Sequence, residues 1–377
     1  MWSPKEKREL KKKQNIESPK ESTTGGAKTS SDSANFAFGQ YLAGLLEGDG
    51  TIIVPNPDLL KRRPVVRICF HSKDECLAVL LKDRIGSGHL VFPKAKNYIL
   101  LEISDKVGLC RIVNLTNGFF RTPKLEAFER LILWLQQRAG EQFSSRGMDL
   151  SPLISSAWLS GFTDADGNFN VILAPRKNKQ LIRVQTQFRI EVRQTYHRES
   201  AYGSTYWDVI SDIARLLDTS VYARSRCVNE KIHYAYFLIA SSRRSKTILR
   251  KYFSKYPLYS SKFLDYQDWC RILDLDEQKE PLAGQKKDWD ELALSTSPSF
   301  AQGEQGEQGE GGGLISPTPL LRSPALLSRK DCLLECSRLK NGMNSKRTLF
   351  SWDHLQTLPK TISLSRGSTA QGVGKGE

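Results

Sequence analysis

The chain has 377 residues, and its 56 Lys and Arg residues outnumber 41 Asp and Glu residues, which gives a formal charge of +15 at pH 7. This balance favours a polyanionic partner such as nucleic acid, and the absence of any run of about 18 apolar residues argues against a membrane span. The seven cysteines are odd in number and form no Cys-x-x-Cys pair, so we expect reduced thiols and no zinc site.

Residues 1 to 35 form a polar, charged opening segment that is poor in aromatic residues. Such a composition cannot bury enough apolar surface to fold, so we expect this leader to be disordered. Its mixture of lysines and acids, without an apolar stretch, is unlike a secretion signal or a good transit peptide.

The first predicted helix ends in the stretch Leu42–Gly50, with the sequence Leu-Ala-Gly-Leu-Leu-Glu-Gly-Asp-Gly. Gly44 and Gly48 lie four residues apart and share a helix face, which would let another helix approach more closely than the usual spacing of about 8–10 Å. Asp49 would stand at the helix C-terminus, where the helix dipole disfavours an anion, and Gly50 fits the residue that ends a helix ahead of a strand. Taken alone, the stretch is equally well an ordinary helix with a polar end.

The first half-domain, residues 36 to 139, also carries a weak strand signal and a lysine ahead of a helix. Arg67 alternates with apolar neighbours, which places it on the polar face of a predicted strand. Lys124 directly precedes the predicted helix Glu126–Gln136, a place where a lysine is ordinarily just solvated. A polar linker, residues 140 to 150, follows this half.

A second stretch, Leu159–Gly167, repeats the first with the sequence Leu-Ser-Gly-Phe-Thr-Asp-Ala-Asp-Gly. Gly161 and Ala165 again share a helix face, and Asp166 follows Asp49 by 117 residues, about the length of a small domain. The repeat favours two half-domains that meet along these helices, with the two acids close together. Because two carboxylates repel each other, this arrangement makes sense if divalent cations lie between them.

The clearest strand runs from Arg183 to Arg193 in the second half-domain, residues 151 to 276. Apolar or β-branched residues occupy every even position and long polar ones every odd position, so one face belongs to the core. Arg and Gln can read base edges in the major groove and Glu can accept from cytosine, whereas the alternative is a solvated outer face. We predict DNA binding, beside Arg67, at Asn170, Arg176, Arg183, Gln185, Gln187, Arg189, Glu191 and Arg193.

Lys262 precedes an aromatic-rich helix, and so occupies the same relative place in its half as Lys124 does in the first. Residues 277 to 377 then change in character, with a Gly-Glu-Gln repeat followed by glycines and a Ser/Pro-rich segment. Such a low-complexity composition buries little core, so we expect this tail to be disordered.

The paired motifs resemble those of the LAGLIDADG homing endonucleases, specifically the monomeric, intron-encoded members with two motifs. The resemblance covers residues 36 to 276. It implies an α+β fold of two pseudo-symmetric αββαββα half-domains whose motif helices form the interface, and whose two antiparallel four-stranded sheets make a saddle for double-stranded DNA. The catalytic position of the motif is Asp in both copies, which implies an active enzyme.

The resemblance also implies a metal site. Asp49 and Asp166 would hold divalent cations, Mg²⁺ or another divalent ion, between two scissile phosphates. Gly48 and Ala165 would contribute further ligands beside them. Oxygen ligands in the company of phosphates suit Mg²⁺, which keeps several waters.

Three further residues receive catalytic roles through the resemblance. Lys124 and Lys262 match the family's basic residue near the scissile phosphates, where positive charge would stabilise the transition state. Gln194 resembles the polar residue that orders water near the metals. Its counterpart in the first half stays open between Phe70 and His71.

The expected activity is site-specific, metal-dependent hydrolysis of phosphodiester bonds, which makes a staggered double-strand break in a long asymmetric DNA target and promotes intron mobility. One alternative is an RNA maturase that assists splicing of its host intron, with intron RNA as a partner and with or without cleavage. Another is a catalytically silent DNA-binding regulator. The family implies a monomer in the mitochondrion, or else in the chloroplast.

Overall fold

The computed structural model describes residues 30–56, 62–176, 179–199, 201, 203–277 and 329–358. The first half-domain contains α2 (Ser30–Gly48), β1 (Gly50–Ile53), β2 (Val65–His71), the 3-10 turn η1 (Ser72–Asp74), α3 (Glu75–Ile85), β3 (His89–Val91), β4 (Tyr98–Ile103), α4 (Lys106–Thr116) and α5 (Leu125–Ala139). The second contains the 3-10 turn η2 (Leu153–Ser155), α6 (Trp158–Asp166), β5 (Gly167–Arg176), β6 (Lys179–Arg193), α7 (Trp207–Leu216), β7 (Val221–Val228), β8 (Lys231–Ala240), α8 (Arg243–Lys255) and α9 (Lys262–Glu277).

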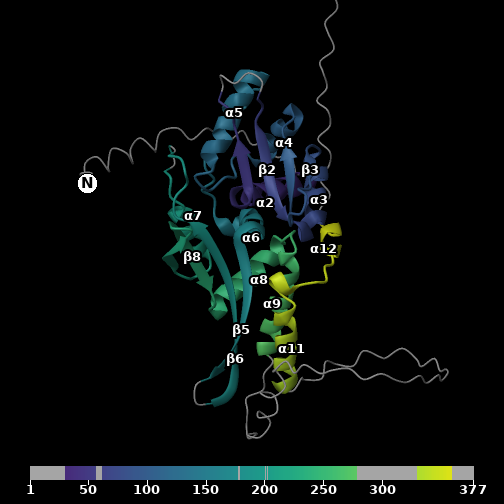
Figure 1. The fold of residues 1–377 in the computed structure, drawn as a ribbon, viewed down its shortest axis with the longest axis vertical. Coiled ribbons are helices and arrows are strands. Elements are labelled where there is room, and N and C mark those ends of the chain that lie inside the picture. The colour runs from purple at the N-terminus through teal and green to yellow at the C-terminus, as the bar shows by residue number, and fades with distance from the viewer. Residues whose placement is uncertain are drawn as a thin grey trace, which may run out of the picture.

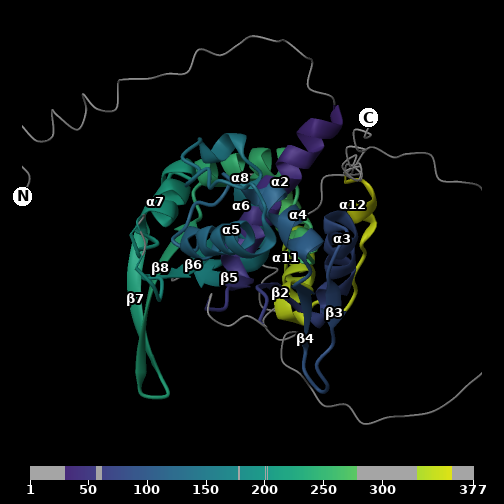
Figure 2. The same cartoon turned by 90° about the horizontal axis from the view of Figure 1, so that it is seen from above.

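Each half-domain holds one antiparallel four-stranded sheet, in the orders β1-β2-β4-β3 and β5-β6-β8-β7. The predicted α+β class with two such sheets is confirmed, and each αββαββα unit carries one more helix at its end, α5 or α9. In Figure 2 the strands line one side of the molecule, while α2, α6 and α8 lie on the other. The arrangement leaves one face of both sheets free of helices.

The two motif helices, α2 and α6, lie side by side where the half-domains meet (Figure 1). A Cβ atom on Gly44 would lie 2.0 Å from the carbonyl oxygen of Trp158, and one on Gly161 would lie 1.9 Å from that of Tyr41. Only residues without side chains allow two backbones to approach so closely. The predicted small-residue interface is therefore where the sequence spacing places it.

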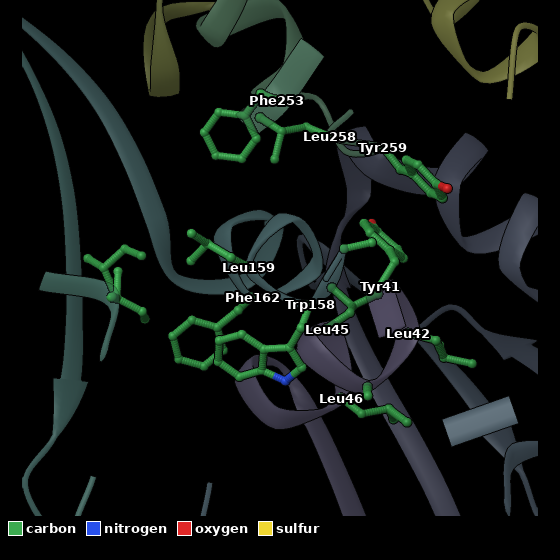
Figure 3. Close-up of a cluster of buried hydrophobic side chains, with 14 of the residues drawn as sticks. Tyr41, Leu42, Leu45, Leu46, Trp158, Leu159, Phe162, Phe253, Leu258 and Tyr259 are labelled. Carbon is green, nitrogen blue, oxygen red and sulfur yellow. The ribbon is translucent and has the colours of Figure 1, made fainter. Parts of the chain in front are cut away.

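Large apolar side chains close the remainder of this interface (Figure 3). Tyr41 stacks on Tyr259 with ring centroids 3.9 Å apart, and Trp158 stacks on Phe162 at 4.6 Å. All four side chains are buried. Because these rings come from both halves, the core is continuous across the junction.

The strand β6 shows the alternation that the sequence predicts. Val184, Thr186, Phe188, Ile190 and Val192 are all buried. The intervening odd residues are exposed or half-buried. One face of β6 therefore packs on the helices, and the other face is the open side of the sheet.

The prediction of a disordered leader fails at its C-terminal end, because α2 begins at Ser30 rather than near residue 36. The aromatic ring of Phe36 packs edge-on against Phe119 with centroids 4.9 Å apart, which anchors this extra length of helix. The leader residues before Ser30 lie outside the described part of the chain.

The prediction of a disordered tail is wrong for residues 329–358, which we name the C-terminal strap. The strap contains α11 (Arg329–Asn341), the 3-10 turn η3 (Asn344–Lys346) and α12 (Asp353–Gln356), and α11 packs against α9. Cys332, Leu333, Cys336 and Leu339 are buried at helical spacing. This short amphipathic pattern overrides the low-complexity composition around it, and the remaining tail lies outside the described residues.

The strap connects the two half-domains on one side of the molecule. The His354 ring stacks on Phe263 with centroids 4.3 Å apart, and His354 Nε2 lies 3.1 Å from the carbonyl oxygen of Tyr259. Lys73 of the first half lies over the ring of Phe350, 5.9 Å from its centroid. The strap therefore contacts both the segment before α9 and the end of η1.

Removing the arginine that fixes the strap should destabilise the protein. Arg347 donates from Nε and Nη2 to Asp265 Oδ1 at 3.0 and 2.9 Å, and only 4% of the Asp265 side chain is exposed. Arg347→Ala leaves that carboxylate without its cation, so we expect a loss of about 3–5 kcal/mol in the free energy of unfolding, measured with urea. The matched control is Arg338→Ala, whose solvent-exposed pair with Glu335 should contribute little to stability. Equal small losses in both variants would contradict an anchoring role for Arg347.

Among the described residues, no helix has the length and apolar character that crossing a membrane requires.

Candidate functional site

The C-terminal ends of α2 and α6 bring two acids to the junction of the half-domains. Asp49 directly follows α2, and Asp166 is the last residue of α6. A Cβ atom on Gly48 would lie 2.1 Å from Ala165 Cβ and 3.3 Å from Asp166 Oδ2, so the two helix ends are in direct contact. The close approach that the paired glycines allow is therefore what gathers the acids.

Surrounding protein atoms and mutual repulsion change the acidity of this pair, although both side chains open to solvent. Desolvation and the neighbouring charge of Asp49 raise the pKa of Asp166 to about 6. Desolvation likewise raises the pKa of Asp49, although the positive charges of Lys262 and Lys124 oppose the change. Because the two carboxylates repel each other, a divalent cation bound between them would be stabilised.

Lys124 and Lys262 lie beneath the motif helices. Lys124 Nζ donates to the carbonyl oxygens of Leu46, Gly48 and Gly50 at 3.0, 3.2 and 2.8 Å. Leu46 and Gly48 belong to the last turn of α2 and Gly50 begins β1, so the ammonium sits at the negative end of that helix dipole. Burial lowers the pKa of Lys124 to about 8.

Lys262 makes the equivalent contacts in the second half. Its Nζ donates to the carbonyl oxygens of Thr163 and Ala165 at 3.2 and 2.7 Å, and burial lowers its pKa. Each lysine starts one helix but neutralises the end of another, which explains a placement that looked unfavourable from the sequence. Both predicted lysines therefore join the two acids in one cluster.

The residues at this site suit a cation that takes only some of its ligands from the protein and the others from phosphate and water. Within the described ranges there is no group of three or more His, Cys, Asp or Glu side chains that could hold a metal ion. The predicted ligands Gly48 and Ala165 offer carbonyl oxygens that already accept from the lysines, although a carbonyl has a second lone pair. Two carboxylates would leave positions for phosphate oxygens and water, which is the coordination that Mg²⁺ favours.

Two cavities open beside the acid pair. One, of about 530 Å³, is lined by Asp49, Asp166, Lys124 and Arg193 among others. The other, of about 150 Å³, is lined by Asp49 and Lys262, with residues at the end of β2. Each lysine therefore faces its own cavity, and the two cavities differ in size and lining.

The strand register corrects the first-half counterpart of Gln194. Gly50 pairs with Ile68, and Gly167 pairs with Ile190. Counting four residues on from each partner aligns Gln194 with Ser72, so neither Phe70 nor His71 occupies the equivalent position. The pattern of apolar residues had suggested an alignment two residues too early.

Gln194 itself does not line either of the two cavities beside the acids. Its Nε2 lies 3.4 Å from the carbonyl oxygen of Ala235. Its neighbour Arg193 lines the larger cavity instead, and the positive charge of Arg193 lowers the pKa of Asp166 against the effect of burial. A role for Gln194 in ordering water stays a prediction.

The open face of the second sheet carries most of the predicted DNA-binding residues. Asn170 pairs with Gln187 across β5 and β6, and Ala174 pairs with Arg183, so these side chains share one face. Gln185, Arg189, Glu191 and Arg193 follow on the same face of β6. Arg176 ends β5, and its side chain lies outside the described residues.

Glu191 is surrounded by arginines rather than free. Its carboxylate pairs with Arg189 at 2.5 Å, with Arg226 at 3.1 Å and, more closely, with Arg224. Arg189 and Arg224 also lie over the Phe237 ring, 5.2 and 5.4 Å from its centroid. Glu191 therefore orders a cluster of arginines, which leaves its oxygens occupied.

Sequence reasoning missed Arg224 and Arg226 on β7. The signal was present as alternation in Tyr222-Ala-Arg-Ser-Arg226, which places both arginines on one face. The register with β8 sets Arg224 opposite Ala235, which pairs with Arg193 on β6, and Arg224 reaches Glu191 diagonally. The first sheet is far less basic, since Arg67 is the only arginine on its four strands and pairs with Glu102 at 2.6 Å.

The raised pKa of Asp166 predicts that this acid weakens the fold at neutral pH. The folded-state pKa of about 6 lies above the value of about 4 for an unfolded chain, so its contribution to stability is complete below about pH 4 and is lost as pH rises through 6. Asp166→Asn removes the charge, and we expect a higher Tm than wild type at pH 7.5 but not at pH 4. Thermal unfolding at both pH values measures this, with Asp83→Asn on α3 as a control that changes little. A lower Tm for Asp166→Asn at pH 7.5 would show that the carboxylate is not repelled.

Known proteins have sequences similar to that of this chain. Residues 159–273 match the family model described as LAGLIDADG endonuclease. The intron-encoded DNA endonuclease aI3 of Saccharomyces cerevisiae is 34% identical over 264 residues, 63% of this chain and 63% of that relative. The intron-encoded RNA maturase bI4 of the same organism is 26% identical over 182 residues, 46% of this chain and 26% of that relative. The chain thus spans less than two thirds of the length of either relative.

A solved structure shows the same fold. The I-LtrWI LAGLIDADG homing endonuclease bound to target DNA matches with a TM-score of 0.51 at 16% identity, over 83% of this chain and 100% of that chain. At this low identity the match concerns the architecture, and the site must be judged from its own residues.

Proposed function

We propose, on the premise that the chain belongs to the LAGLIDADG endonuclease family, that it is a site-specific DNA endonuclease that cuts both strands of its target. The observation that carries the proposal is the pairing of Asp49 and Asp166 where the two helix ends meet, with one partly buried lysine beside each cavity. The net charge of +15 and the arginine cluster on the open sheet face support a DNA partner.

The chain's own residues would divide the chemistry as follows. Asp49 and Asp166 would hold Mg²⁺, which when bound activates water and neutralises charge at the phosphate. Lys124 and Lys262 are fixed on helix carbonyls, so their positive charges are in place before DNA arrives. Arg193 adds a further cation to the larger cavity only.

The duplication supports a double-strand break in an asymmetric target. Two cavities, each with its own lysine, provide a place for one scissile phosphate on each strand. The two sheet faces differ, since the second carries the arginine cluster and the first carries a neutralised Arg67. We therefore propose a long target with unlike halves, cut with a stagger by a monomer.

An RNA maturase is the second candidate function, because one relative bears that name. The intact acid pair favours the nuclease, and a dual role is compatible with it. A silent regulator would have no need for both acids and both lysines. The intron-encoded fungal relatives support intron homing as the biological role and the mitochondrion as the compartment.

A cleavage selection tests the proposal without knowledge of the target. The purified protein is incubated with a randomised duplex DNA library in Mg²⁺, and cut molecules are captured and sequenced. We expect one long sequence to be enriched in Mg²⁺ and none in EDTA. Enrichment of bound but uncut DNA would overturn the endonuclease, and a splicing assay with the host intron RNA would then test the maturase.

The arginine cluster should contribute to DNA affinity. Arg224→Ala removes a cation that Glu191 and Phe237 hold on the open face, and we expect binding to weaken by about 1–3 kcal/mol. The matched control is Arg244→Ala on α8, which packs on the opposite face of the sheet and has an exposed pair with Asp218. Fluorescence anisotropy with the selected target at fixed salt measures both. Equal losses would mean that net charge alone sets the affinity.

A further inference from the structure

We propose that Glu47 and Asp164, the sixth residue of each motif, are positioning residues that hold Lys124 and Lys262 at the helix ends, one for each DNA strand. Glu47 borders the larger cavity and Asp164 the smaller one, but their carboxylates accept hydrogen bonds from the segments that lead to the two lysines. Both acids are almost fully buried, with 2% and 6% of their surface exposed. A buried carboxylate persists only where donors surround it.

Glu47 gathers its donors from the segment that leads to Lys124. Its carboxylate accepts from the backbone N–H of Arg121 at 3.0 and 2.9 Å and from that of Thr122 at 2.5 Å. Lys124 follows two residues later, and its own N–H donates to the Thr122 hydroxyl at 3.2 Å. Glu47 therefore fixes the start of the turn from which the Lys124 side chain extends.

Asp164 makes the same arrangement ahead of Lys262. Its carboxylate accepts from the backbone N–H of Tyr259 at 2.7 Å and of Ser260 at 3.1 Å, and from the Ser260 hydroxyl at 2.5 Å. The Lys262 N–H donates to that hydroxyl at 3.2 Å. A third carboxylate, Asp74 of the first half, accepts from the N–H of Ser261 at 2.7 Å. The pattern of the first half is thus repeated around the second lysine.

Glu47 and Asp164 each also accept a hydrogen bond from a side chain on the opposite motif helix. Trp158 Nε1 donates to Glu47 at 2.5 Å, and the Tyr41 hydroxyl donates to Asp164 at 2.7 Å. Trp158 and Tyr41 are the residues whose carbonyls approach Gly44 and Gly161 at the helix crossing. The position of each lysine is therefore tied to the packing of the two half-domains.

The inference rests on the proposed endonuclease function and adds a strand assignment to it. If each lysine serves one scissile phosphate, loss of Glu47 or of Asp164 should slow the cleavage of only one DNA strand. Glu47→Gln and Asp164→Asn should then slow opposite strands. A general weakening of the fold would slow both strands together.

The test uses the full-length protein and the selected target, labelled on each strand in turn. We expect Glu47→Gln to slow one strand by about 10- to 100-fold, the range seen when residues that orient a reactive group are lost, so that nicked DNA accumulates. Glu47→Asp keeps the charge and should slow that strand less. The control is Glu141→Gln, which should cut like wild type because Glu141 is a half-buried acid that pairs with Lys106, away from both cavities. A melting curve and DNA affinity verify that each variant is folded.

A double-mutant cycle distinguishes positioning from independent effects. If Glu47 acts through Lys124, then Glu47→Gln should add little to the loss already caused by Lys124→Met. Additive losses, or equal slowing of both strands by Glu47→Gln, would overturn the proposal. If wild type cuts no DNA, the proposed function fails instead.

A measurement on the free protein keeps the inference testable in that case. Amide hydrogen exchange, followed by mass spectrometry, reports whether the backbone N–H groups of Arg121 and Thr122 stay hydrogen-bonded to Glu47. We expect Glu47→Gln to speed exchange in this turn and Glu141→Gln to leave it unchanged. Unchanged exchange in Glu47→Gln would overturn the role of Glu47 whatever the protein cuts.

Discussion

Asp49→Asn is expected to lower the single-turnover rate of DNA cleavage by about 10³-fold or more, and Asp166→Asn should do the same. A neutral amide lacks the charge that holds a divalent cation, and the cation supplies several kcal/mol to phosphodiester hydrolysis, about tenfold in rate for each 1.4 kcal/mol. Both acids lie at the contact between Gly48 and Ala165, so neither can replace the other. Gel analysis of the selected target with enzyme in excess measures the rate.

Measuring the DNA affinity of each variant distinguishes a loss of catalysis from misfolding. Each substitution removes a negative charge from the surface that faces phosphate, so affinity should be retained or should increase. Asp83→Asn on α3 serves as the charge-matched control and should cut at the wild-type rate. Cleavage by either active-site variant within tenfold of wild type would contradict the paired-acid site.

Gly161→Ala is expected to destabilise the protein by about 3 kcal/mol, because overpacking a rigid contact forces the backbone to move. The new Cβ would lie 1.9 Å from the carbonyl oxygen of Tyr41 and 2.8 Å from the backbone nitrogen of Leu45, and neither atom belongs to a flexible side chain. Separation of α2 from α6 also moves Asp166 away from Asp49, so cleavage should fall together with stability. Urea unfolding and the cleavage rate measure the two effects.

The matched control places the same methyl group where space exists. A Cβ on Gly342 in the strap would lie 3.4 Å from its nearest neighbour, the carbonyl oxygen of Leu339. Gly342→Ala should therefore change neither stability nor cleavage appreciably. If Gly161→Ala proved as mild as this control, the helix crossing would have to be looser than the structure has it.

The sequence was sufficient to predict which helix and strand faces form the site, because these features depend on local sequence patterns. Two glycines four residues apart define the close face of α2, and the alternation along β6 defines which side chains reach the open sheet face. Both patterns depend only on the periods of helix and strand. The two lysines could be paired because each precedes a helix in its own half.

Contacts between distant segments could not be read in the same way. The cluster of arginines around Glu191 depends on the register of β6, β8 and β7, which the sequence of a single strand does not reveal. The lysine contacts with helix carbonyls depend on where α5 and α9 begin relative to α2 and α6. Gln194 was misaligned by two residues because apolar alternation alone does not fix a register.

The strap was missed for another reason. Its apolar residues occupy one short helix inside a long stretch rich in Gly, Ser and Pro, and the average composition hid them. Cys332 and Cys336 lie four residues apart and are buried against α9, so they pack as small apolar side chains. A window of one helix length would have detected the pattern where a window of the whole tail did not.

Mapping the cut ends on both strands of the selected target tests the paired-acid site most directly. The target is labelled at either 5′ end and incubated with wild type in Mg²⁺ and in EDTA. We expect one break in each strand, offset across the minor groove, in Mg²⁺ alone. Breaks that persist in EDTA, or that occur at scattered positions, would contradict a site in which two acids act through a bound cation at two defined phosphates.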